Sequence, residues 1–242
     1  MNSAEEIARQ VLNELESLAT PERREGMSRY FTTSMRCIGV GTPDLRLILR
    51  ETQNRMKGEP KETVLALARN LTSTRAFEAR QLAFEVVARH AVSMRTVTVP
   101  EVEELGSGND NWASVDTFSI LLSGALWLRG RFEDETFVGW AESENPWWRR
   151  TALVSVVPFN VKSRGGTGDP RRTLLVVDLL KADRHPAVVK AVSWALRSLV
   201  AWNPSTVRRY LEENAELLAS LVRREVRNKL ETGLKNPRPA RR

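Results

Sequence analysis

The feature that most constrains this chain is a helix-capping side chain followed directly by proline, which recurs along its length. The pair occurs at Thr20-Pro21, Thr42-Pro43, Asn145-Pro146, Asp169-Pro170 and Asn203-Pro204, with weaker versions at Glu59-Pro60 and His185-Pro186. A proline at the first helical position is preorganised, and the side chain before it accepts a hydrogen bond from a free backbone N–H. Ser3 and Glu6 predict a further start, a capping box ahead of an apolar helical pattern. These starts predict an all-α chain of about ten to twelve helices, each of about three turns.

Some of these helix starts also repeat in content. The segment "NPWWRRTALVSVV" begins at residue 145 and "HPAVVKAVSWALR" at residue 185, and each has a cation, Arg150 or Lys190, four residues after its proline. A helix-pair period near 40 residues is typical of HEAT repeats. We therefore expect a curved, right-handed α-solenoid of HEAT-like helix pairs over residues 1–232, with a plain helical bundle as the alternative. The Gly-rich "SRGGTGD" reads as a flexible basic connection that carries Arg164, and residues 233–242 as a disordered basic tail.

The charge balance and the few potential metal ligands limit the classes of partner and cofactor. Thirty-seven Lys and Arg residues against 30 Asp and Glu residues give a net charge of +7, which favours polyanionic partners such as nucleic acid. The single cysteine, Cys37, excludes an internal disulfide, and His90 and His185 stand far apart, so we expect no metal and no nucleotide or redox cofactor. His185 is expected to cap a helix. Because no signal peptide and no apolar stretch of membrane-spanning length is visible, we expect a cytoplasmic protein without a membrane partner.

Most of the seven tryptophans are expected to pack in the interior, among them Trp127, Trp140 and Trp202. Trp112 differs because polar residues surround it in "NDNWASVD", and Asp116 follows it four residues later. Four residues are about one helical turn, so the two side chains share a helix face. Trp112 either plugs the end of a helix pair or faces a ligand, whereas Asp116 by itself reads as a capping or ion-paired acid.

Two further motifs allow both a packing and a binding interpretation. Trp194 lies among apolar neighbours in "KAVSWALRSL", and this local context alone predicts core burial. Arg149 and Arg150 follow a pair of tryptophans. On the inner helix of a repeat they would reach a phosphate backbone, and otherwise they belong to a solvated face.

Four motifs in this order, "NWASVD", "WAESENPWWRRTALV", "KAVSWALRSL" and "LVRREVRNKL", resemble the DNA alkylation repair family, the AlkD-like HEAT-repeat DNA glycosylases. Upstream, "GVGTPDLRLILRE" and "FEARQLAFEVV" resemble the first repeats of that family, so the resemblance runs from about Tyr30 to Leu230. The chain departs from the family pattern where relatives often carry a second aromatic residue before "NDNWASVD". It also has Ser193 where glycine is frequent.

The resemblance implies a monomeric DNA glycosylase of base excision repair that acts on double-stranded DNA. Such enzymes hydrolyse the N-glycosidic bond of cationic alkylated purines, N3-alkyladenine and N7-alkylguanine. Asp116 matches the catalytic aspartate of the family, Trp112 and Trp194 match its two aromatic residues, and Arg150 matches a cation that contacts the DNA backbone near the lesion. The other residues that we expect to contact DNA are Trp148, Arg149, Arg164, Lys190 and Arg197.

The chemistry of these residue types agrees with that function. A carboxylate beside the sugar stabilises an oxocarbenium-like transition state, and a purine that is already cationic can leave without a general acid. Aromatic rings attract the cationic base by cation–π contact. Two alternatives are a non-catalytic HEAT-repeat protein that binds damaged or branched DNA, and a protein–protein scaffold, which the basic charge disfavours.

Overall fold

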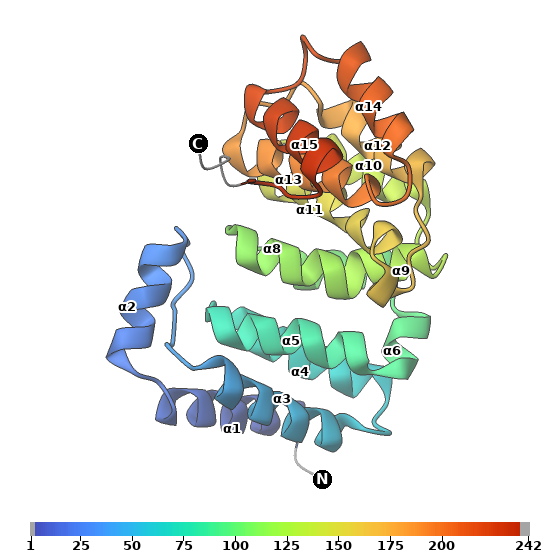
Figure 1. Ribbon diagram of the computed structural model, residues 1–242. Coiled ribbons are helices and arrows are strands. Elements are labelled where there is room, and N and C mark those ends of the chain that lie inside the picture. Colours follow the sequence, from blue (N-terminus) through green and yellow to red (C-terminus); the bar gives the residue numbers. More distant parts are fainter. Residues whose placement is uncertain (1–2, 238–242) are drawn as a thin grey trace. The chain divides into compact units, whose positions relative to one another are not determined.

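The computed structural model describes residues 3–237, and their regular elements are all helical (Figure 1). Extended pairing within this range is limited to one isolated bridge between Arg36 and Ala76, which confirms the all-α prediction. The helices run from α1 to α15 with three short η segments, so the expected ten to twelve is too low. The excess comes from short helices, since α6 has 6 residues and α9 has 5. No helix within the described range is long and apolar enough to cross a membrane.

The chain divides into two compact units, with the boundary between Leu122 and Ser123. Unit 1 contains α1 (Ala4–Ser17), α2 (Pro21–Tyr30), α3 (Thr42–Met56), α4 (Lys61–Ser73), α5 (Phe77–Arg89), α6 (Ala91–Thr96), α7 (Val99–Gly106) and α8 (Trp112–Phe118). The π-helical segment η1 (Ser119–Ser123) crosses the boundary. Unit 2 contains α9 (Gly124–Leu128), α10 (Asp134–Ala141), α11 (Pro146–Ser155), η2 (Val157–Asn160), η3 (Lys162–Arg164), α12 (Pro170–Leu180), α13 (Pro186–Leu199), α14 (Pro204–Glu213) and α15 (Ser220–Thr232). The single domain over residues 1–232 stays a prediction.

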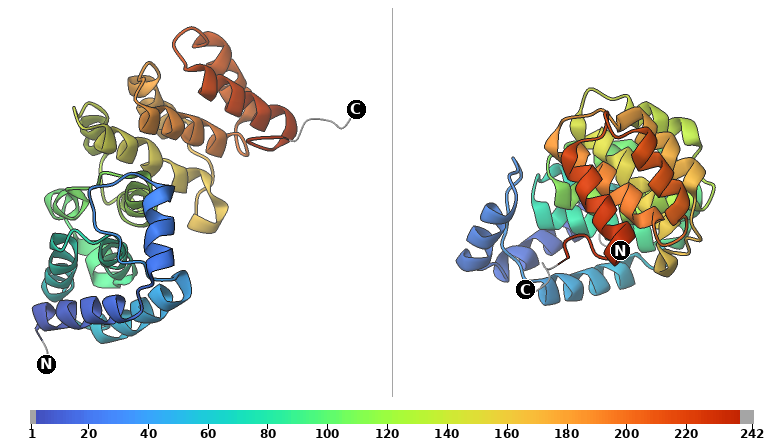
Figure 2. Two further views of the ribbon diagram at one scale, coloured as in Figure 1. Left: turned by 90° about the vertical axis from the view of Figure 1, so that its left-hand side faces the viewer. Right: turned by 45° about the horizontal axis from the view of Figure 1, so that its top comes forward.

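The helices of unit 1 pack in two rows. In one row α3, α5 and α8 follow one another, and in the other α1 lies against α4, which pairs with α5 (Figure 1). The helix α2 buries none of its residues and lies outside these rows (Figure 2). Stacked helix pairs of this kind bury a continuous core between the rows.

Unit 2 repeats the two-row arrangement. Helices α11, α13 and α15 pack one after another, while α10 lies against α12 and α14 lies against α15. Helices α11 and α13 begin at Pro146 and Pro186, as the 40-residue repeat predicts. The centre is aromatic, because the fully buried Trp127 stacks on Phe137 with ring centroids 3.8 Å apart.

Most of the predicted capping side chains form the expected bonds. Backbone N–H groups at the helix starts donate to the side chains of Ser3, Thr20, Asn145, Asp169 and His185. Two predicted caps are wrong. Thr42 is the first residue of α3, and Gly41 occupies its cap position. Helix α4 begins at Lys61, so its cap position is Pro60 and not Glu59. Asn203 occupies the cap position of α14, but its side chain makes no capping bond.

The motif "FEAR" at the start of α5 joins this helix to the segment before α3. The Glu78 carboxylate, 1% exposed, accepts hydrogen bonds from three consecutive backbone N–H groups, those of Ile38, Gly39 and Val40, at 2.9, 2.7 and 3.3 Å. The neighbouring thiol of Cys37 is buried, and this burial, followed by the negative charge of Glu78, raises its pKa. A buried carboxylate thus fixes the segment that leads into α3.

The Gly-rich segment 163–169 is held in place, so its interpretation as a flexible connection is wrong. The N–H of Gly166 donates to the oxygen of Val161 at 3.1 Å, and the N–H of Gly168 donates to the oxygen of Phe159 in η2 at 2.9 Å. A Cβ at Gly166 would lie 2.2 Å from the oxygen of Pro158, and one at Gly168 would lie 2.6 Å from the Cβ of Trp202. Only glycine fits these close approaches.

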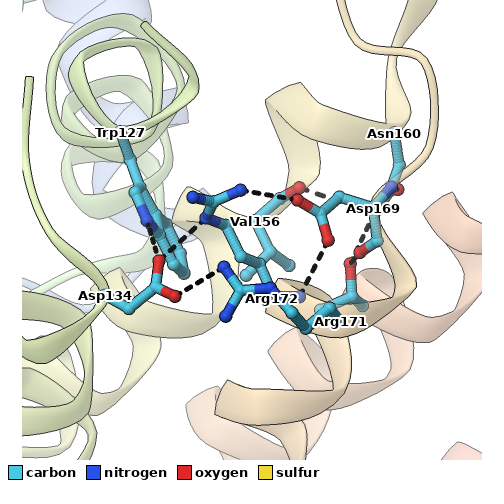
Figure 3. Close-up of polar contacts among 8 residues, drawn as sticks. Trp127, Asp134, Val156, Asn160, Asp169, Arg171 and Arg172 are labelled. Atoms are coloured by element: carbon cyan, nitrogen blue, oxygen red, sulfur yellow. Dashed lines mark hydrogen bonds and ion pairs between the residues drawn. The ribbon is translucent and has the colours of Figure 1, made fainter. Parts of the chain in front are cut away.

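An ion-pair network fastens the end of this segment to α10 (Figure 3). The Arg172 guanidinium pairs with Asp134 at 2.8 Å and with Asp169 at 2.9 Å, and Arg171 reaches the second oxygen of Asp134 at 2.7 Å. The indole N–H of Trp127 donates to the same Asp134 carboxylate at 2.8 Å. Burial alone would raise the pKa of Asp134, but the hydrogen bonds from Trp127, Arg172 and Arg171 outweigh it and hold that pKa below its ordinary value.

The predicted tail begins with residues that fold back on α15. The Lys235 ammonium pairs with the Glu225 carboxylate at 3.2 Å, and the Lys229 ammonium donates to the oxygen of Gly233 at 2.6 Å. Residues 238–242 of the predicted tail lie outside the described residues.

Candidate functional site

The loop before α8 is built so that the helix begins at Trp112. The side chain of Asn111 accepts the N–H of Ser114 at 2.9 Å, which caps the helix, and its amide donates to Asp110 at 3.2 Å. Asp110 in turn accepts the backbone N–H of Ser34 at 2.6 Å. Burial would raise the pKa of Asp110, but these hydrogen bonds lower it overall, so the carboxylate stays ionised.

Trp112 keeps part of its ring exposed while the rest packs on aromatic neighbours. It is 37% exposed, and its ring meets those of Tyr30 and Phe31 edge-on, with centroids 5.3 and 6.2 Å away. Phe31 is buried and packs on Phe77 at 4.8 Å. Trp112 therefore packs on other aromatic rings, as a packing residue would, and still keeps part of its side chain exposed, as a ligand-facing residue would.

Tyr30 is a candidate site residue that the sequence alone did not indicate. It is the last residue of α2 and is 71% exposed beside Trp112. An exposed tyrosine and an exposed tryptophan side by side form an aromatic surface that can bind a flat or cationic group. The signal is absent from the sequence because the two rings meet only through the tertiary fold.

Asp116 is half-buried on α8, one turn after Trp112. The helix passes into the π-helical turn η1 only three residues later, and the hydroxyl of Ser119 donates to the oxygen of Val115 at 2.7 Å. Turns of this kind are frequent at functional sites because they shift the side-chain register of a helix. Trp112 and Asp116 thus lie on one short helix that begins at a well-fixed cap and ends in an irregular turn.

In unit 2, Trp194 is half-buried on α13, although its neighbours Ala191 and Ala195 are buried. The complete burial that the local pattern predicts is therefore wrong. The apolar stripe of α13 faces the core, and Trp194 lies at the edge of that stripe. An edge position leaves part of the indole available to a ligand.

Arg197 is directed into the protein. Its guanidinium lies 3.7 Å from the buried Glu225 carboxylate and donates to the Ser193 hydroxyl at 3.1 Å, and that hydroxyl donates to Glu225 at 2.6 Å. Burial lowers the pKa of Arg197, and Glu225 opposes this effect. Ser193 therefore supports a buried ion pair.

Arg149 and Arg150 both hold other parts of unit 2. Arg149 pairs with Asp183 at 2.8 Å and donates to the carbonyl oxygens of Ser143 and Glu144. Arg150 is 5% exposed and donates to the carbonyl oxygen of Ala187 at 2.6 Å, across to α13. The alternative that placed Arg150 on a solvated face is therefore wrong.

The remaining predicted contacts differ in exposure. Lys190 on α13 and Arg164 on η3 are exposed, whereas Trp148 is half-buried and its ring lies 5.0 Å from that of Trp140. Unit 1 thus carries Trp112 and Asp116 one turn apart on α8, and unit 2 carries its own candidates on α11, α13 and η3. Among the described residues, no three His, Cys, Asp or Glu side chains lie close enough to hold a metal ion.

Comparisons with known proteins place the chain in a family. Residues 11–230 match the family of DNA alkylation repair enzymes. A solved structure, described as a predicted DNA alkylation repair enzyme from Enterococcus faecalis, is similar with a TM-score of 0.74 and 20% identity over 88% of this chain and 97% of that one. At this identity the likeness shows the fold alone. A comparison with the curated proteins finds no significant match. Because the family match covers most of the sequence, the chain belongs to the DNA alkylation repair enzyme family.

Proposed function

We propose that this protein is a DNA glycosylase that removes cationic alkylated purines from duplex DNA by hydrolysing the N-glycosidic bond. The observation that carries the proposal is the Trp112–Asp116 pair on α8, beside the exposed ring of Tyr30, in a member of a DNA alkylation repair family. The proposal includes N3-alkyladenine and N7-alkylguanine as substrates. It describes a monomeric cytoplasmic enzyme of base excision repair that needs no cofactor.

Asp116 has the role that a positively charged transition state requires. As the bond between sugar and base breaks, positive charge develops on the sugar, and a nearby carboxylate stabilises it. An N3-alkyladenine or N7-alkylguanine base is already cationic, takes the electron pair of the broken bond and leaves neutral, so no second group is needed to protonate it. Water then adds to the sugar cation and loses a proton to the solvent, which completes the hydrolysis. One fixed carboxylate is therefore sufficient for this class of substrate.

The aromatic residues supply selectivity for a charged lesion. The rings of Trp112 and Tyr30, and separately that of Trp194, attract a cationic base or the developing sugar cation by about 0.5–2 kcal/mol each. A neutral base gains neither this attraction nor the easy departure. The exposed cations Lys190 and Arg164 are proposed to contact DNA phosphates, with Trp148, Arg149, Arg150 and Arg197 supporting that surface.

Asp116→Asn tests the proposal because it keeps the shape of the side chain and removes the charge. The charge acts in the transition state, so single-turnover release of 7-methylguanine should slow by about 10²–10³-fold. Binding to the same duplex should hold or improve slightly, because a negative charge facing a polyanion weakens ground-state binding.

Asp44→Asn serves as the matched control. Asp44 lies on α3, also in unit 1, in a partly exposed ion pair with Arg23 at 3.2 Å. This variant removes the same charge and should release base at the wild-type rate. If Asp116→Asn releases 7-methylguanine at the wild-type rate, Asp116 is a structural acid. If the wild-type protein binds the duplex and releases no base, the non-catalytic DNA-binding alternative replaces the proposal.

A further inference from the structure

Unit 1 contains a polar cavity, apart from Trp112 and Asp116, that the proposed chemistry does not use. It has a volume of about 440 Å³ and is lined by three arginines, Arg69, Arg75 and Arg80, with Glu104, Ser107 and Gly108 among its other walls. It lies where the turn between α4 and α5 meets the loop between α7 and α8. We call it the arginine pocket.

Arg80 is the buried wall of this pocket. Its side chain is 5% exposed, and one guanidinium nitrogen donates to the carbonyl oxygens of Leu105 and Ser107 at 3.1 and 2.8 Å. The Nε of the same group is buried and has no hydrogen-bond partner within the described part of the chain. Burial has the largest effect on the pKa of Arg80 and lowers it. The charge of Asp110 raises this pKa and the charge of Arg75 lowers it, and the result is a pKa of about 10. A desolvated cation with an unused donor is stabilised by an anion at its side.

Arg75 is held in an unfavourable backbone conformation at the rim of the pocket. Its φ of 54° lies in the left-handed region that side chains other than glycine rarely adopt. Two backbone hydrogen bonds fix it there, because the N–H of Arg36 donates to the oxygen of Arg75 and the N–H of Phe77 donates to the oxygen of Arg36, both at 2.9 Å. The exposed side chain donates to the hydroxyl of Ser34 at 3.0 Å. Such outliers cluster at binding sites, where the fold imposes them.

Among the residues that line the pocket, guanidinium groups outnumber carboxylates by two, and the nearby Asp110 offsets one of these positive charges. Arg69 pairs with Glu104 at 2.8 Å, and both side chains are partly exposed, so one carboxylate stands against three guanidinium groups. Guanidinium groups bind phosphate oxygens through paired, planar N–H donors. We propose that the arginine pocket binds a phosphate group, with Arg75 and Arg69 as its accessible donors and Arg80 as its buried one.

The position of the pocket suggests two sources of that phosphate. Arg75 donates a hydrogen bond to Ser34, and both Ser34 and the cap residue Asn111 donate to Asp110, so the pocket lies beside the start of α8. A backbone phosphate of a duplex bound at Trp112 is one source, and this source rests on the proposed function. Free phosphate or a small phosphate ester is the other, and it requires neither DNA nor Asp116.

Arg75→Gly tests the pocket with little risk to the fold, because glycine accepts the left-handed backbone and removes the guanidinium. Inorganic phosphate is titrated by ³¹P NMR, and an undamaged duplex is titrated by fluorescence anisotropy at several salt concentrations. We expect phosphate affinity to fall by about 10-fold or more, as for the loss of a charged hydrogen bond. If the ligand is DNA, the slope of log affinity against log salt falls by about one unit as well.

Arg95→Gln is the matched control. Arg95 is an exposed cation on α6 in unit 1 outside the pocket, and its loss should leave phosphate affinity unchanged. Loss of phosphate affinity with an unchanged DNA slope assigns the pocket to a free phosphate or phosphate ester. The proposal is overturned if phosphate binding survives both Arg75→Gly and Arg69→Gln. It is also overturned if the wild type binds no phosphate and Arg75→Gly leaves the salt slope of DNA binding unchanged. Asp116→Asn should leave the phosphate affinity and the salt slope of DNA binding unchanged, so a failure of the glycosylase proposal is recognised separately.

Discussion

At the scale of single residues, Trp194 and Trp127 show how burial separates a packing tryptophan from a candidate binding one. Trp127 is enclosed by aromatic rings, while Trp194 is half-buried at the edge of the α13 stripe. Trp127→Ala should lower the free energy of unfolding by about 3–5 kcal/mol, as is typical when a fully buried aromatic residue is truncated. Trp194→Ala should lose less stability and should slow 7-methylguanine release, because its exposed part is proposed to attract the cationic base.

Urea unfolding curves and single-turnover base release on both variants check this prediction. Trp127→Ala controls for the general effect of a destabilised unit 2. A Trp194→Ala protein that is as unstable as Trp127→Ala would make Trp194 a core residue and remove it from the site.

At the scale of elements, the Asp134 network joins the first residue of α10 to the start of α12. Because the pKa of Asp134 in the folded protein is below its ordinary value of 3.8, its ionised form contributes stability above that value. This contribution is lost as the pH falls through the depressed folded pKa. Asp134→Asn should therefore be less stable than the wild type at pH 7, and the difference should be smaller at a pH below 3.8. Denaturant midpoints at the two pH values measure it, and a difference independent of pH would contradict it.

The elements also show what the sequence could and could not predict. The starts of α11 and α13 are local features, since a cap and a proline lie next to each other in the chain, and both were predicted correctly. The close packing of Gly168 involves Trp202, more than thirty residues away in the sequence, and the exposed pair of Tyr30 and Trp112 depends on the position of α2. Contacts between distant segments leave no periodic pattern in the sequence, so these two features required the structure.

At the scale of the whole molecule, the candidate residues are divided between the two compact units. Trp112, Asp116 and the arginine pocket belong to unit 1, whereas Trp194, Arg150 and Lys190 belong to unit 2. Each part of the proposed function can therefore be tested within the unit that carries it. The Asp116→Asn and Arg75→Gly variants examine unit 1, and Trp194→Ala examines unit 2.

The buried thiol of Cys37 has a practical consequence for folding studies. It is the only cysteine and belongs to unit 1, whereas six of the seven tryptophans belong to unit 2. Modification by a thiol reagent therefore reports the opening of one half of the chain, and indole fluorescence chiefly reports the other. The single-domain prediction expects both signals to change at the same urea concentration. A thiol that becomes reactive well before the fluorescence changes would show two independently folding halves, without any substitution in the protein.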